Sequence, residues 1–90
     1  MDEFQHIREA LATNHLQEAE AMIDQELTRN ANSATLHYLR GKIYMKSSQW
    51  SKAITSFLHA EAIDPESPAR QCRQMLCEIM NFYNKDMYNQ

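Results

Sequence analysis

A spaced set of small, aromatic and proline residues constrains the fold of this chain more than any other feature of its sequence. Small residues let two helices cross closely, and Tyr44, Trp50 and Phe57 are expected to fill the space between them. Glycine inside a helix costs about 1 kcal/mol against alanine, so Gly41 implies a packing reason. Proline pushes the residue before it out of the helical region. Of the two crossing helices, the one that contains Phe57 should therefore end near Ile63, just before Pro65. The set is Gly41, Tyr44, Ala53, Phe57, Ala60 and Pro65.

The spacing of these residues resembles the tetratricopeptide repeat, a helix–turn–helix unit of about 34 residues. The sequence departs from the family pattern at two positions: His37 stands where the family has tryptophan, and Arg40 where it has leucine. These departures leave open how the start of that helix packs. The resemblance implies an all-α, tetratricopeptide-like superhelix of two helical hairpins and a C-terminal capping helix. It also implies a protein that binds other proteins and is not an enzyme.

Apolar periodicity and local turn signals predict five helices. Ser33 and Ser67 are suited to cap helices, and Asn14 is suited either to cap a helix or to take the left-handed conformation. Pro68 suits the first position of the last helix. The expected helices cover residues 3–12, 16–28, 34–46, 50–63 and 68–83.

One domain is expected, because ninety residues are too few for two. When the sequence is aligned with itself at an offset of one repeat length, Ile23 aligns with Phe57 and Ile7 with Gly41. Because Ile7 replaces the glycine, the first repeat should pack more loosely. The tail, rich in Tyr and Asn, is expected either to fray or to fold back on the domain or on a second copy. The predicted parts are a single domain over 1–83, made of a weak repeat (1–33), a strong repeat (34–67) and a capping helix (68–83), and a tail (84–90).

Cysteine spacing and the lack of targeting signals predict a cytoplasmic protein. Cys72 and Cys77 are five residues apart on one expected helix and cannot bridge each other, which favours reduced thiols. The N-terminus lacks the features of a signal peptide, and no apolar run is long enough to span a membrane. We therefore expect a soluble, cytoplasmic protein with no membrane contact.

Charge is segregated along the chain. Residues 1–33 carry a net charge of −5, residues 34–60 of +4, and residues 61–90 of −2. One interpretation is that oppositely charged layers attract each other when they stack, with little gain for each exposed pair. The other is a basic stripe that binds an acidic partner.

No pattern in the sequence indicates catalysis, a cofactor or a metal site. The four histidines form no H-x3-H pair, and no Cys/His cluster has the spacing of a zinc finger. A single glycine cannot form a phosphate-binding loop, and no nucleophile lies in a known motif. Binding of nucleic acid is not expected either, because the pI is about 5.7.

The resemblance implies a concave groove, since the first helix of each tetratricopeptide hairpin lines such a surface. Apolar, aromatic and basic residues together suit an extended peptide or a helix of another protein. Leu11, Leu76 and Ile79 would extend the groove or belong to the core. The lysine- and asparagine-rich clamp of family members that grip acidic chaperone tails is not expected, because the asparagines and a third full repeat are missing. The predicted groove residues are Phe4, Arg8, Thr35, Tyr38, Lys42, Met45 and Cys72.

The competing hypothesis is self-association. In that case the groove and the C-terminal tail pair two copies as a homodimer, and no foreign protein is bound. An array this short leaves apolar surface to cover. The sequence names neither the partner nor the oligomeric state.

Overall fold

The computed structural model describes residues 4–83, and within that range the chain is helical with no strand. The bounds agree with the predicted ranges to within two residues, so the all-α fold class is confirmed. The predicted tail, residues 84–90, lies outside the described residues. The helices are α1 (Gln5–Ala12), α2 (Leu16–Arg29), α3 (Ala34–Lys46), α4 (Trp50–Ile63) and α5 (Ala69–Tyr83).

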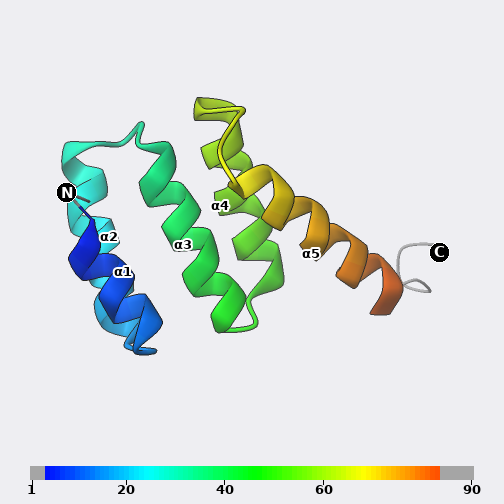
Figure 1. Ribbon diagram of the computed structural model, residues 1–90, viewed down its shortest axis with the longest axis horizontal. Coiled ribbons are helices and arrows are strands. Elements are labelled where there is room, and N and C mark those ends of the chain that lie inside the picture. The colour runs from blue at the N-terminus through cyan, green and yellow to red at the C-terminus, as the bar shows by residue number, and fades with distance from the viewer. Residues whose placement is uncertain (1–3, 84–90) are drawn as a thin grey trace.

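The helices are stacked in chain order along the length of the molecule (Figure 1). α1 and α2 form one antiparallel hairpin at one end, and α3 and α4 form a second in the middle. α3 also packs against α2, and α5 packs against α4 at the other end. Each helix therefore depends mainly on its neighbours in the sequence.

The two hairpins share one backbone geometry, displaced along the chain by the repeat length predicted from the sequence. The ends of α1 and α3 lie one repeat length apart, and so do both the beginnings and the ends of α2 and α4. In the turns, Asn14 and Ser48 have positive φ angles of 64° and 61°. The next amide, of His15 or Gln49, donates to the carbonyl oxygen five residues earlier at 2.8 Å. This is the hydrogen bond of a Schellman-type helix end, and it confirms the left-handed turn predicted at Asn14.

The predicted serine caps are also present, and they too lie one repeat length apart. Ser33 Oγ accepts a hydrogen bond of 3.2 Å from the amide of Leu36 at the start of α3. Ser67 Oγ accepts one of 3.2 Å from the amide of Ala69 at the start of α5. Each satisfies an amide that has no partner within its own helix.

α3 packs on two of its sides, which explains why its apolar residues form no single stripe. Leu36, Leu39 and Ile43 join the core that α3 shares with α1 and α2. Tyr44 belongs to a second core with Phe57 of α4 and with α5. An amphipathic helix at a surface needs one apolar side, whereas α3 lies between two layers.

α3 and α4 approach closely at Gly41 and Phe57. A Cβ atom on Gly41 would lie only 2.4 Å from Cε1 of Phe57, whose side chain is fully buried. The packing reason predicted for the glycine is thus confirmed. The expectation that Trp50 fills the same space is wrong, because Trp50 begins α4 and is 40% exposed.

In the first hairpin, Ile7 and Ile23 occupy the positions equivalent to Gly41 and Phe57. Both isoleucines are completely buried, so the looser packing expected here is not found at this position. Two isoleucines of medium size thus stand where the second hairpin has a glycine and a phenylalanine. Such an exchange of volume between facing positions keeps a core filled.

α5 is held against α4 by an ion pair as well as by apolar contacts. Arg73 donates from Nε to Glu61 Oε2 at 2.6 Å and from Nη2 to Glu61 Oε1 at 3.0 Å. Both side chains are largely covered, and Leu76 of α5 is buried in the core beside them. The hydrogen bonds from Arg73 lower the pKa of Glu61 and raise the pKa of Arg73.

We predict that Gly41→Ala lowers the free energy of unfolding by on the order of 1 kcal/mol. Overpacking against Phe57 costs about 1–3 kcal/mol, which outweighs the roughly 1 kcal/mol that alanine gains as a helix former. Urea denaturation measures the change. In a Phe57→Ile background, which copies the first hairpin, the same substitution should cost less. A higher denaturation midpoint for Gly41→Ala alone would contradict the close crossing.

We also predict that Glu61→Gln destabilises the protein in a pH-dependent way. The native pKa of Glu61 lies below the ordinary value of 4.5, so the stabilisation is present above that value and is lost as pH falls through the native pKa. Urea denaturation at a series of pH values should show the difference from wild type shrinking at acidic pH. Glu78→Gln, which changes an exposed carboxylate of α5, is the control and should have a smaller effect. A loss that stays constant with pH would contradict the ion pair.

Candidate functional site

The predicted groove residues of α3 lie together on one side of the helix. Thr35, Tyr38, Lys42 and Met45 are all half-buried. Their spacing of three and four residues places them in one row along α3. Lys42 Nζ lies 5.8 Å from the centroid of the Tyr38 ring, within reach of a cation–π contact. The structure therefore brings the predicted aromatic and basic residues side by side.

Tyr38 is a firmly supported part of this row. Its ring lies 6.0 Å from the ring of Phe57, and its side chain packs against both core clusters. Met45 and Cys72 pack against the second of these clusters. A half-buried tyrosine that rests on a fixed core offers flat contact area at little cost in side-chain entropy.

The predicted groove residues from other helices are placed less uniformly. Arg8 of α1 and Cys72 of α5 are half-buried. Phe4, just before α1, is 5% exposed and belongs to the core, so it offers a partner almost no surface. Leu11 and Leu76 are likewise core residues, whereas Ile79 is 42% exposed.

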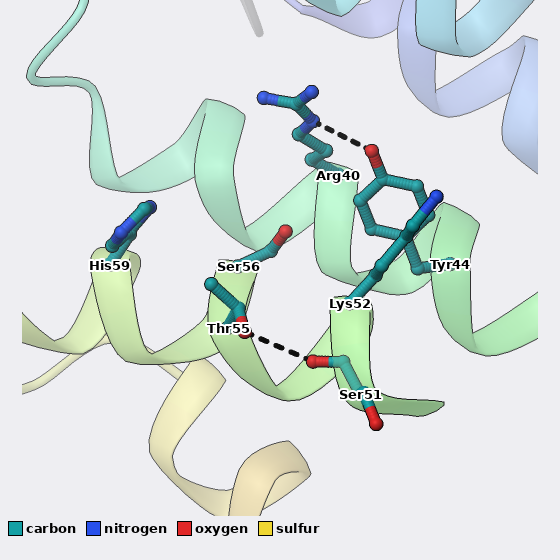
Figure 2. A pocket seen from close by; sticks show the side chains of 7 residues that line it. All are labelled: Arg40, Tyr44, Ser51, Lys52, Thr55, Ser56 and His59. Atoms are coloured by element: carbon teal, nitrogen blue, oxygen red, sulfur yellow. Dashed lines mark hydrogen bonds between the residues drawn. The ribbon is translucent and has the colours of Figure 1, made fainter. Parts of the chain in front are cut away.

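The opposite side of α3 has a hollow that the sequence analysis did not predict. Its volume is about 370 Å³, and it lies between α3 and α4 (Figure 2). Residues 40 and 44 differ from residues 38 and 42 by about half a helical turn, which is why the two sites face away from each other. The residues that line the hollow are Arg40, Tyr44, Ser51, Lys52, Thr55, Ser56 and His59.

Two cations at this hollow are held by one aromatic ring. The guanidinium carbon of Arg40 and Nζ of Lys52 each lie 5.7 Å from the centroid of the Tyr44 ring. Arg40 Nε also donates to the Tyr44 hydroxyl at 3.3 Å. Tyr44 itself is buried, so it fixes both cations relative to α3 and α4.

Carboxylates of α2 approach the same cluster from the first hairpin. Arg40 lies 3.7 Å from an oxygen of Asp24, and the Tyr44 hydroxyl donates to Glu20 at 3.5 Å. These contacts join the acidic first hairpin to the basic second hairpin, as expected for stacked layers of opposite charge. Both are long and Asp24 is more than half exposed, so each adds little to stability.

The far end of the hollow is formed by Ser56 and His59. Ser56 is 6% exposed, and its oxygen points toward the side where Arg40 lies (Figure 2). The His59 ring packs edge-on against His37 of α3, with 5.3 Å between the centroids. Arg40 and His37 are the two departures from the tetratricopeptide pattern. Those departures were therefore the sequence signal for this hollow.

Other kinds of site are not found in the described part of the chain. Within residues 4–83, no group of three or more His, Cys, Asp or Glu side chains could hold a metal ion. Cys72 and Cys77 are free thiols. None of the described helices is both long enough and apolar enough to cross a membrane.

Comparison with solved structures finds a relative that shares this fold. The solution NMR structure of Bacteroides fragilis protein BF1650 is 36% identical in sequence, with a TM-score of 0.89. The match covers 99% of this chain and 91% of that one. The chain belongs to the same family as BF1650. No protein-family model matches the chain, and no curated protein does either.

The relationship to BF1650 covers all five helices. It therefore concerns the whole stack, including both sides of α3.

Proposed function

We propose that this protein is a tetratricopeptide-like adaptor that binds a peptide or helix of another protein along one side of α3. The single observation that carries the proposal is the Tyr38–Lys42 pair. An aromatic ring supported by Phe57 and a lysine 5.8 Å from its centroid form a half-exposed, pre-arranged contact point. Interfaces draw much of their energy from such fixed aromatic anchors.

Two features support the tetratricopeptide-like arrangement. Helix ends, turns and serine caps recur at the same interval along the chain. That interval matches the repeat length of the family, which is about 34 residues. The crossing of Gly41 and Phe57 lies at the positions where the repeat pattern has its own glycine and aromatic residue. In such an array the first helices of successive hairpins, here α1 and α3, would share one face.

An acidic ligand fits this face best. Residues 34–60, which form most of the second hairpin, carry four bases and no acid, and Lys42 is one of these bases. Lys42 would meet a carboxylate of the ligand, while Tyr38 and Met45 would contact apolar side chains. Arg8 of α1 is half-buried and would add a second cation on the same face.

The alternative function is self-association, and a different observation favours it. Large apolar side chains are exposed on α4 and α5, and a second copy would cover them. These side chains lie on helices other than α3, which carries Tyr38 and Lys42, so the two functions predict different sensitive residues. The exposed residues are Trp50, Leu58, Ile63, Met75 and Ile79.

We predict that Tyr38→Ala and Lys42→Glu each weaken binding of peptides selected by display against the immobilised protein. The loss should be about tenfold or more for each, because both remove an anchor at the centre of the face. The selected peptides should be rich in Asp and Glu, and the Lys42 effect should fade as salt rises. Fluorescence anisotropy measures the affinities.

Lys52→Glu is the matched control, since it makes the same charge change on the opposite side of α3. It should leave peptide affinity within about twofold. The two lysine variants should keep wild-type helicity because surface changes cost about 0.5 kcal/mol or less. Tyr38→Ala also loses its packing against Phe57, so its helicity is compared by circular dichroism before its affinity is measured. Equal losses for Lys42→Glu and Lys52→Glu would contradict the proposed face. If light scattering shows a dimer that trimming residues 84–90 makes monomeric, and no peptides are selected, self-association is the better account.

A further inference from the structure

The hollow between α3 and α4 is lined by hydrogen-bond donors and cations. Arg40 and Lys52 are basic, and two serines contribute hydroxyl groups. The hydroxyls of Tyr44 and Thr55 also line the hollow, but each already donates its proton within the protein. His59 adds a ring nitrogen that can donate. No carboxylate lines the hollow among the residues that the structure describes. A cavity with this lining selects an anion.

Ser56 is the strongest evidence for a ligand. The residue is only 6% exposed, yet within residues 4–83 no hydrogen bond holds its hydroxyl. Some other helical hydroxyls bond the preceding turn, as Thr55 does to the carbonyl oxygen of Ser51 at 3.1 Å. The Ser56 hydroxyl instead points into the hollow (Figure 2). Its oxygen is not among the fully enclosed polar atoms, so it is accessible from the hollow, and a bound anion would accept its hydrogen bond.

The cations of the hollow are placed before any ligand arrives. Arg40 and Lys52 flank the buried Tyr44 ring at equal distances of 5.7 Å, and Arg40 is further held by the Tyr44 hydroxyl. Groups fixed in this way lose little freedom when a ligand binds. Asp24 offsets part of the charge of Arg40, but at 3.7 Å it makes no short bidentate pair. The guanidinium therefore keeps donors for an anion.

We propose that this hollow binds a phosphate group. Phosphate presents three oxygens and a charge between about −1.5 and −2, which matches donors that converge from several directions around two cations. A carboxylate has one charge and two oxygens in a plane, so it would leave part of this lining unused. The hollow is open on one side, so it admits a phosphate carried on a larger molecule as well as the free anion.

The experiment is an NMR titration of the isotopically labelled protein at constant ionic strength. Inorganic phosphate and O-phosphoserine are the two test ligands, and acetate and chloride are the comparison anions. We expect saturable shifts of the amide signals of Arg40 and residues 51–59 with both phosphates, and none that saturate with chloride. Tighter binding of phosphoserine indicates a phosphorylated side chain as the natural source, and tighter binding of inorganic phosphate indicates a small molecule.

Two variants test the residues that carry the proposal. Ser56→Ala and Lys52→Gln should each weaken phosphate binding by about fivefold or more, since each removes a charge-assisted hydrogen bond. Ser56→Ala leaves a small residue in a helix and keeps the fold. Lys42→Gln is the matched control on the other side of α3 and should change phosphate affinity by less than about twofold.

Three results would overturn the site. These are shifts that grow linearly and equally with phosphate and chloride, binding of acetate as tight as that of phosphate, and equal losses for Lys42→Gln and Lys52→Gln. This site and the peptide-binding face lie on opposite sides of α3, so the failure of one leaves the test of the other intact.

Discussion

The close crossing of α3 over α4 at Gly41 and Phe57 is the contact on which the rest of the structure depends. With no side chain on Gly41, the Phe57 ring lies against the backbone of α3 and closes the second hairpin. The same ring supports Tyr38 on one side of α3. It also belongs to the core on which Tyr44 and α5 rest. Both candidate sites therefore take their geometry from this one packing position.

Local signals account for the parts of the fold that could be predicted. A serine cap, a left-handed turn and a helix-ending proline act within a few residues, so Ser33, Asn14 and Pro65 each set a helix boundary that sequence alone reveals. Gly41 could be assigned a packing role because its cost within a helix needs a reason. In these cases the physical effect and the sequence signal occupy the same positions.

The features that could not be predicted depend on contacts between distant residues. The sequence shows that Trp50 and Phe4 are apolar and close to helix starts. It does not show that Trp50 is exposed at the start of α4 or that Phe4 is buried in the core. The row of Tyr38 and Lys42 was found because it lies on one helix. The hollow was missed because its lining comes from two helices and its key hydroxyl belongs to an ordinary serine. Only the departures at His37 and Arg40 could have indicated it.

Ion pairs join successive layers of the stack. At successive contacts an acid on the second helix of a hairpin meets a base on the helix that follows, as Asp24 meets Arg40 and Glu61 meets Arg73. The second contact is short and bidentate, whereas the first is 3.7 Å long. The weaker pair is the one whose arginine lines the hollow. An anion bound in the hollow would compete with Asp24 for Arg40. A shorter Asp24–Arg40 ion pair would hold α2 and α3 together more strongly, but it would also neutralise the positive charge that an anion needs.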